Sequence, residues 1–372
     1  MIVESIIFFI INIYVFVRGW QALPNVTGLQ TGYTLIYFLI LGIVILSFYS
    51  KLKFTEEIAY AFRLIRRYYL FFLMFFFLAV IFADFIRIIN YFSGIFPEWT
   101  TNNYQHIKNI YFLSVIFISI IVTITGYRQY ASPRISELNL QIDNFNGYSG
   151  SLNILAISDM HLGIVIRKER LCDWVEIINN QNPDLILLVG DTFDHTFKSL
   201  DYREIIYELS SLTSKYGVYA VLGNHEYFFN SDRSIEYLKL AGIKVLRDQC
   251  VIIDNRLLLA GRDDAHNRNR KPVELLLSES GSGLPVILMD HQPVDLEGSV
   301  KNRVNLHISG HTHGGQIFPG NFFASLRWKL PYGYRKIGSS HFYVSSGLGF
   351  SYIPMRLGTR SEIVRIHLKL QN

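Results

Sequence analysis

The sequence has few cysteines and few charged residues for its length. Two cysteines, Cys172 and Cys250, occur in 372 residues, which excludes a disulfide-stapled fold and predicts two reduced thiols. Charged residues make up 17% of the chain, and the net charge is +5. The lysines and arginines form no clustered stripe interleaved with aromatic residues, so nucleic acid is not expected as a partner.

Charge is scarcest in the first third of the chain. Residues 31–50 and 109–127 contain no Asp, Glu, Lys, Arg or His, and each stretch is long enough for a helix that crosses a hydrocarbon layer of about 30 Å. Residues 68–83 are also uncharged and are followed by Asp84 and Arg87. A helix places residues three apart on one face, so we expect these two to form an ion pair near one end of a third span.

The first hydrophobic segment, residues 2–17, is short and carries Glu4 and Asn12. A signal peptide is disfavoured because no lysine or arginine precedes Arg18 and no small-residue cleavage site follows. We therefore expect a first span here, with a bundle of three spans as the alternative. The predicted transmembrane region covers residues 1–127, with helices at 2–20, 31–50, 68–90 and 109–127.

The distribution of basic residues predicts the orientation of these spans. The segment between the second and third spans is rich in lysine and arginine, whereas residues 21–32 and 88–106 contain neither. The positive-inside rule places the basic segment in the cytoplasm, and counting spans then places everything after Tyr127 there too. We expect a multi-pass protein of the cell membrane. The amphipathic stretch 54–67 either lies on the membrane surface or extends the third span.

From Arg128 onward the composition is that of an ordinary globular protein. Residues 128–152 are predicted to hold a linker and a first edge strand beginning near Ile135, and residues 153–372 a second domain. Short β-rich runs alternate with helical patterns at 169–180 and 201–214. The predicted strands are 154–157, 185–189, 218–222, 286–289 and 306–309, with a hairpin at 250–261 turning at Asp254-Asn255 and a last pair at 341–345 and 362–370. This pattern favours an α/β fold of two packed sheets flanked by helices over a single doubly wound sheet.

Five short motifs follow these predicted strands and carry side chains that bind metals. They are Ser158-Asp159-Met160-His161, Gly190-Asp191-Thr192-Phe193-Asp194, Gly223-Asn224-His225-Glu226, Asp290-His291 and Gly310-His311-Thr312-His313. The carboxyl ends of strands converge on a crevice in α/β folds, so the motifs are expected to meet. Extended Asp-x-His and His-x-His pairs would point both side chains to one side. The mixture of carboxylate, imidazole and amide suits Mn, Fe or Zn.

In these motifs and their order the chain resembles the calcineurin-like metallophosphoesterase superfamily, whose pattern is D-x-H, G-D-x-x-D, G-N-H-[DE], a lone H and G-H-x-H. The resemblance covers about residues 153–316. Gly314-Gly315-Gln316 and the run over residues 346–363 are similar to the membrane-associated branch of YkuE- and YaeI-type phosphodiesterases. The resemblance implies a calcineurin-like sandwich, preceded here by an all-α transmembrane bundle.

The resemblance also implies a role for each residue. Asp159, His161 and His313 would bind a first divalent metal ion, and Asn224, His291 and His311 a second. Asp191 would bridge the two, and a water held between them would supply a hydroxide nucleophile. His225 would protonate the leaving group or stabilise the phosphoryl oxygens, with Asp194 orienting it.

Other candidates have weaker support. The histidines outside the motifs are taken as structural or surface residues, with His195 the least certain because it follows the Asp191 motif. Arg167, Lys168 and Arg262 are taken as solvated surface charge rather than phosphate contacts. Residues 317–337 mix aromatic and basic side chains, which fits either a flap that enters lipid headgroups or a loop packed on the protein's own core.

The sequence thus predicts a membrane-anchored, dinuclear-metal phosphoesterase that hydrolyses a phosphodiester or pyrophosphate bond, with a lipid or lipid-linked phosphate as its substrate. One alternative is a lipid enzyme similar to UDP-2,3-diacylglucosamine pyrophosphatases. Another is a membrane scaffold that keeps the fold without the chemistry. A transporter is disfavoured because Asp84 and Arg87, the ionisable pair of the third span, can neutralise each other.

Overall fold

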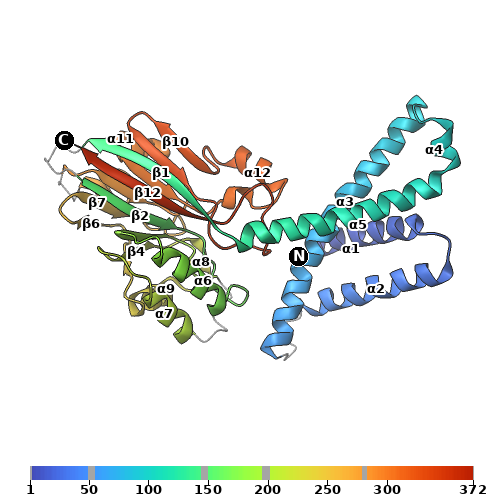
Figure 1. The fold of residues 1–372 in the computed structure, drawn as a ribbon, viewed down its shortest axis with the longest axis horizontal. Coiled ribbons are helices and arrows are strands. Elements are labelled where there is room, and N and C mark those ends of the chain that lie inside the picture. Colours follow the sequence, from blue (N-terminus) through green and yellow to red (C-terminus); the bar gives the residue numbers. More distant parts are fainter. Residues whose placement is uncertain (1, 49–54, 144–149, 195–201, 279–282, 372) are drawn as a thin grey trace. The chain divides into compact units, whose positions relative to one another are not determined.

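The computed structural model describes residues 2–48, 55–143, 150–194, 202–278 and 283–371. The chain divides into two compact units, Met1–Thr125 and Gly126–Asn372, which Figure 1 draws in blue to cyan and in green to red. Each unit is described by itself below.

The first unit is helical. Its helices are α1 (Ile2–Ala22), α2 (Thr27–Leu46), α3 (Glu56–Ser93), α4 (Glu98–Asn102) and α5 (Tyr104–Ala131), the last of which continues into the second unit. All of these except α4 are long and apolar enough to be candidate membrane spans. Helix α3 begins at Glu56, so the described part of the 54–67 stretch extends the third span and is not a separate surface helix.

Polar contacts join the first three helices. Asn12 of α1 is buried, and its side-chain oxygen accepts hydrogen bonds from the hydroxyls of Tyr37 on α2, at 3.1 Å, and Tyr69 on α3. The predicted ion pair between Asp84 and Arg87 is confirmed. Arg18 of α1 joins it, with Nη2 2.6 Å from Oδ2 of Asp84, which the sequence did not indicate because the two residues are far apart in the chain.

The second unit contains two mixed six-stranded sheets. The first sheet has the strand order β1-β12-β2-β3-β4-β5 and the second β10-β11-β9-β8-β7-β6. Their bounds are β1 (Arg134–Asp143), β2 (Gly150–Ile157), β3 (Leu185–Val189), β4 (Val218–Val221), β5 (Lys244–Val245), β6 (Gln249–Ile253), β7 (Leu257–Gly261), β8 (Val286–Met289), β9 (Leu306–Ser309), β10 (Gly333–Ile337), β11 (Ser340–Val344) and β12 (Glu362–Gln371). Strands β2 to β5 are parallel to one another, as are β7, β8, β9 and β11.

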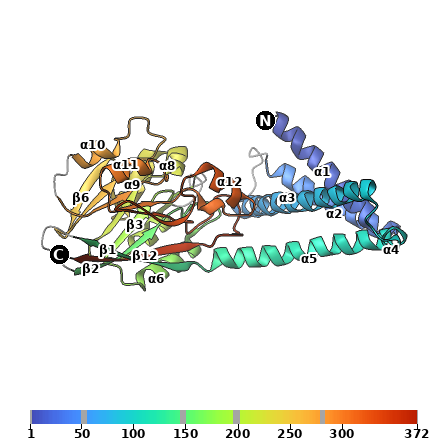
Figure 2. The ribbon, with the colours of Figure 1, turned by 90° about the horizontal axis from the view of Figure 1, so that it is seen from above.

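Helices cover the outer faces of the two sheets (Figure 2). The helices of this unit are α6 (Lys168–Asn179), α7 (Tyr202–Ser210), α8 (Asn224–Phe229), α9 (Ser231–Leu240), α10 (Val273–Ser278), α11 (Leu296–Lys301) and α12 (Gly320–Arg327), with a 3-10 turn at His313–Gly315. Inner strands such as β3, β4, β7 and β9 are buried on both faces, and their side chains alternate between two packing layers. Leu155 and Leu188 pack with Trp174 of α6 on one face, whereas Ile154 and Leu187 face the other sheet.

The fold is therefore the predicted α/β sandwich of two sheets flanked by helices. The hairpin of β6 and β7 is confirmed, and its turn residues Asp254 and Asn255 have φ of 51° and 56°, as a tight hairpin turn requires. The last two predicted strands do not form a pair, because β11 belongs to the second sheet and β12 to the first. β1 is an edge strand, as expected.

Candidate metal centre

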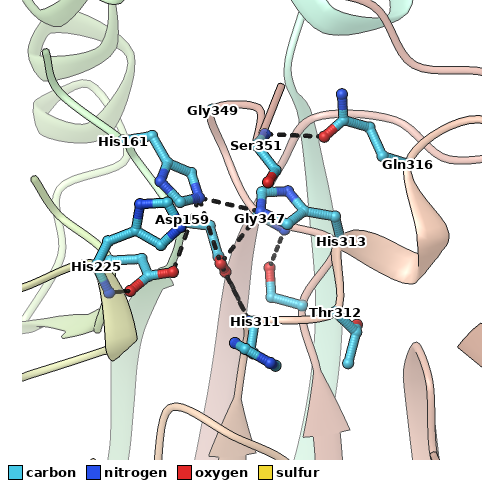
Figure 3. Close-up of polar contacts among 12 residues, drawn as sticks. Asp159, His161, His225, His311, Thr312, His313, Gln316, Gly347, Gly349 and Ser351 are labelled. Atoms are coloured by element: carbon cyan, nitrogen blue, oxygen red, sulfur yellow. Dashed lines mark hydrogen bonds and ion pairs between the residues drawn. The ribbon is translucent and has the colours of Figure 1, made fainter. Parts of the chain in front are cut away.

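The five motifs meet where five strands end. Asp159 follows β2, Asp191 follows β3, Asn224 begins α8 after β4, and His291 and His311 follow β8 and β9. Asp159, Asp191 and His291 are almost fully buried. Figure 3 shows His161, His225 and His313 turned toward one another around Asp159, with His311 on its other side.

The backbone reaches this arrangement through left-handed conformations. Asp159, His161, Asp191, His311 and His313 all have positive φ, between 49° and 70°. The expectation that Asp159-Met160-His161 and His311-Thr312-His313 are extended is therefore wrong. Each pair converges through a tight turn instead. Non-glycine residues adopt this conformation at some energetic cost, and such strain concentrates at functional sites.

Asp159, His161 and His313 form one group of potential ligand atoms. Nε2 of His161 lies 3.1 Å from Nε2 of His313, and the latter lies 3.4 Å from Oδ1 of Asp159. Burial lowers the pKa of His161 to about 3 and, together with the positive charge of Arg356, lowers that of His313 well below its usual value. Both imidazoles are therefore neutral, the form that binds a cation.

Asp191, His291 and His311 form a second such group. Nε2 of His291 lies 3.2 Å from Oδ2 of Asp191, and Nδ1 of His311 lies 2.6 Å from Oδ1 of Asn224. The ring of His291 donates from Nδ1 to the carbonyl of Val189 at 2.8 Å. This bond fixes the tautomer that leaves Nε2 for a ligand, as is usual for metal-binding histidines.

Asp191 lies between the two groups. Its Oδ2 atom is 3.2 Å from Nε2 of His291 and 3.8 Å from Nε2 of His161. Burial alone would lower the pKa of His291, but the Asp191 carboxylate raises it well above its usual value. A cation bound there would compete with that proton. The donor set, two carboxylates with imidazoles and an amide oxygen, fits divalent metal ions.

His225 adjoins the first group but has a different set of contacts. Its ring nitrogen Nδ1 lies 3.1 Å from Oδ1 of Asp194, and its backbone N–H donates to Oδ1 of Asp191 at 2.8 Å. Burial alone would lower the pKa of His225, but the bond to Asp194 and the charge of Asp191 raise it. His225 also lies close enough to His161 and Asp191 to be a potential ligand itself.

Glu226 is a positioning residue to which the sequence analysis gave no role. Its buried carboxylate accepts the backbone N–H groups of Asp191, Phe193 and Gly223 at 2.7–3.0 Å. It thereby ties the loop after β3 to the start of α8. Glu226 is the last residue of the Gly223-Asn224-His225-Glu226 motif, so its place in the motif could have indicated a role. Gly223 itself is required, because a Cβ there would lie 2.2 Å from Oδ1 of Asp191.

Arg356 was also missed, although it lies in the 346–363 run. Its side chain is fully buried and donates to the carbonyls of Ser346, Gly347 and Gly349 at 2.6–2.9 Å. One of its nitrogens lies 3.3 Å from Nδ1 of His313. The loop that it holds backs the first group, since a Cβ at Gly347 would lie 2.7 Å from Cβ of Asp159.

The weaker sequence candidates lie apart from the ligand atoms. The expectation that Arg262 is a solvated surface charge is wrong. It is buried, with Nη1 3.2 Å from a carboxylate oxygen of each of Asp290 and Asp295. Lys168 pairs with Glu204 at 3.4 Å, and Arg167 donates to the carbonyl of Ile164. His195 lies outside the described residues. The remaining histidines have local partners or are exposed: His106, His266, His307, His341 and His367.

Residues 317–337 form α12 and β10, and α12 presents an apolar surface. Phe318, Phe322, Phe323 and Leu326 are 58–70% exposed, so this part of the segment does not pack on the protein's own core. Leu330, by contrast, is buried. The ring of Trp328, at the end of α12, lies 5.4 Å from the ring of His311. The exposed helix therefore adjoins the second ligand group.

The fold and the site define a two-sheet α/β protein with a buried candidate centre for divalent metal ions.

Residues 152–315 match the Calcineurin-like phosphoesterase family. The chain is 31% identical to an uncharacterized metallophosphoesterase of Helicobacter pylori, over 66% of each chain, just under two thirds of that relative's length. It is 30% identical to the uncharacterized metallophosphoesterase YkuE of Bacillus subtilis, over 66% of this chain and 90% of that one. A transmembrane protein with metallophosphoesterase domain from Bos taurus is 31% identical, over 68% of this chain and 61% of that one. The chain belongs to the calcineurin-like metallophosphoesterase family.

Proposed function

We propose that this protein is a membrane-anchored phosphoesterase that uses two divalent metal ions to hydrolyse a phosphodiester or pyrophosphate bond. The observation that carries the proposal is the convergence of two ligand groups on either side of Asp191. Asp159, His161 and His313 would hold one ion, and Asn224, His291 and His311 the other, with Asp191 shared. Manganese, iron and zinc all suit these donors. A bound pair of such ions supplies the positive charge that activates water and stabilises a phosphoryl group in transfer.

The protein's own side chains supply the proton that hydrolysis requires. The reaction adds the oxygen of one water molecule to phosphorus and breaks one P–O bond, so the departing oxygen needs a proton. His225 is suited to give it, because Asp194 holds Nδ1 and keeps the pKa of the ring raised. A positioned general acid of this kind contributes roughly 10²- to 10⁴-fold in rate.

A lipid or lipid-linked phosphate is the substrate class that we propose. Support comes from α12, whose exposed Phe322, Phe323 and Leu326 adjoin Trp328 and so His311. Large exposed apolar side chains beside cations are typical of surfaces that enter a lipid headgroup layer. Arg327 supplies such a cation, whereas Lys329 pairs with Glu297. An acyl chain held at α12 would leave its phosphate near the second ligand group.

The reaction can be tested directly by phosphorus NMR of total membrane lipids incubated with the Mn-loaded full-length protein. The matched control is Asp191→Asn. We expect a resonance that changes with the wild-type protein alone, and its shift will identify a monoester, diester or pyrophosphate. If no lipid resonance changes while a soluble phosphodiester is hydrolysed, the lipid part of the proposal is wrong.

We propose further that the second unit lies in the cytoplasm. Lys51 and Lys53 between α2 and α3, together with the arginines toward the N-terminal end of α3, favour that side. Tyr91, near the end of α3, is 84% exposed and would then be extracytoplasmic. A Tyr91→Cys variant in intact cells should react with a membrane-impermeant thiol reagent, whereas Cys172 and Cys250 should react only after lysis. The reverse pattern would contradict this orientation.

A further inference from the structure

A cavity of about 820 Å³ lies within the first unit, lined mainly by α1, α3 and α5 and also by residues of α2 and α4. Its walls are apolar and include the small side chains Ala79 and Ala83 of α3, facing Val115 and Ile116 of α5. Cavities of roughly 300–1,000 Å³ are the size in which proteins bind small molecules and cofactors. Packing alone does not account for a space of this size, because interiors are normally filled to crystal density.

Long side chains of α5 bond to the neighbouring helices beside the cavity. Nζ of Lys108 donates to the carbonyl of Gln21 at 3.0 Å, and Nε2 of Gln105 donates to that of Leu23 at 3.1 Å. The hydroxyl of Tyr111 donates to the carbonyl of Ala79 at 2.6 Å. These bonds join α5 to α1 and α3 through side chains, and the small residues Ala79 and Ala83 of α3 leave the space beside them open.

One end of the cavity is positively charged. Arg18, Arg87 and Lys108 line it, and no Asp or Glu is among the described residues that do. Asp84 does not line the cavity but forms ion pairs with Arg18 and Arg87. The three cations and this one carboxylate together carry a net charge of +2. Arg87 also donates to the hydroxyl of Tyr104 at 2.9 Å, and both residues line the cavity.

The charged end lies where headgroups would be. Arg18 and Arg87 stand near the C-terminal ends of α1 and α3, and Lys108 stands in the second turn of α5. Trp99 and Tyr104 line the same end, and such residues are enriched at the level of lipid headgroups. The apolar walls run from this end toward the middle of the candidate spans.

We propose that this cavity binds one anionic phospholipid from the membrane. Its phosphate would lie among Arg18, Arg87 and Lys108, and an acyl chain would fill the space along Ala79, Ala83 and Val115. This site is distinct from the metal centre, because none of the residues that line the cavity is among the candidate metal ligands. The lipid stabilises the bundle and is not the substrate. The inference does not rest on the proposed function.

Native mass spectrometry of the full-length protein tests this inference. The protein is purified in detergent and supplied with equal amounts of phosphatidylglycerol and phosphatidylcholine. The wild-type protein should retain one phosphatidylglycerol per chain, with a preference of at least about tenfold over phosphatidylcholine. Lys108→Gln should reduce that preference severalfold. Ala83→Phe, which fills the cavity and keeps every charge, should abolish retention of both lipids.

Arg66→Gln is the matched control, because Arg66 lies toward the N-terminal end of α3, outside the cavity lining, and donates to the carbonyl of Ser47. It should retain phosphatidylglycerol like the wild type. If Ala83→Phe fails to fold, as judged by its elution profile and helical circular dichroism, Val115→Phe fills the cavity from α5. Equal retention of the two lipids, retention by a folded cavity-filling variant, or displacement of the lipid by inorganic phosphate would overturn the proposal.

Discussion

Nδ1 of His225 lies 3.1 Å from Oδ1 of Asp194, while the backbone N–H of the same His225 donates to Asp191 at 2.8 Å. The residue proposed as the proton donor is thus held by two carboxylates, one through its ring and one through its backbone. Its ring also lies 4.5 Å from the ring of His161. The proton donor and the ligand groups are therefore positioned as one unit.

Asp194→Asn should shift the pH dependence of turnover. The rate requires protonated His225, so it falls as pH rises through the pKa of that ring. The bond to Asp194 is the largest of the contributions that raise this pKa, so its loss should lower the pKa and move the alkaline limb of the kcat profile to lower pH. Asp232→Asn, on the exposed surface of α9, should leave the profile unchanged. An unshifted limb in Asp194→Asn would remove Asp194 from its proposed role.

His225→Ala should retain metal and lose rate. We expect kcat to fall by roughly 10²- to 10⁴-fold, the usual contribution of a positioned general acid, with the metal content unchanged by atomic absorption. His367→Ala is the control, because His367 pairs with Glu137 on the exposed edge of the first sheet. Loss of metal from His225→Ala would identify His225 as a ligand instead, since it lies close to His161 and Asp191.

Glu226→Gln should loosen the loop after β3. An amide offers one acceptor oxygen and turns its N–H₂ group toward backbone donors that the carboxylate now satisfies. Leaving a buried donor unpaired costs about 1–3 kcal/mol, so the free energy of unfolding in urea should fall by that amount. Metal affinity should fall as well, because Asp191 is held by this loop. Glu236→Gln, exposed on α9, should change neither quantity, and equal stability of the two variants would refute the positioning role.

Replacement of Phe322 and Phe323 by Ser should impair turnover of lipid substrates selectively. The two rings are 58% and 62% exposed, so the change should cost little stability. We expect kcat/KM to fall at least about tenfold on phospholipid vesicles and to stay unchanged on a soluble phosphodiester, because only the vesicle would contact α12. Tyr207→Ser, a similarly exposed aromatic on α7, is the control. An equal loss on both substrates would show that α12 supports the fold and does not bind lipid.

Local patterns in the sequence predicted most of the strands, the hairpin and the positions of the motifs, because alternation and turn residues are short-range signals. They did not predict β5 or β10. They did not reveal how the motifs converge. The left-handed turns at Asp159 and His311 arise from tertiary contacts, such as the hydrogen bond from the His311 backbone N–H to Asp159. Arg262 was not predicted to be buried because its carboxylate partners, Asp290 and Asp295, are distant in the chain. Arg356 was missed although its carbonyl partners lie in the same 346–363 run, because a buried arginine that donates to backbone carbonyls leaves no periodic pattern in the sequence.

The exposure of α12 could not be read from composition either. Phe322 and Leu330 are equally apolar, yet the first is exposed and the second is buried. The packing that separates them depends on α11 and β11, which place Leu330 in a cluster with Leu296 and Phe342. Periodicity within residues 317–337 contains no information about those contacts.

The metal content of the purified full-length protein, beside that of Asp191→Asn, tests the central claim most directly. Inductively coupled plasma mass spectrometry should find two divalent ions per chain in the wild type. In Asp191→Asn it should find at most one, with turnover of phosphodiesters abolished and the thermal unfolding of the second unit retained. A single ion in the wild type, or two ions and full activity in Asp191→Asn, would contradict a centre built on a shared Asp191.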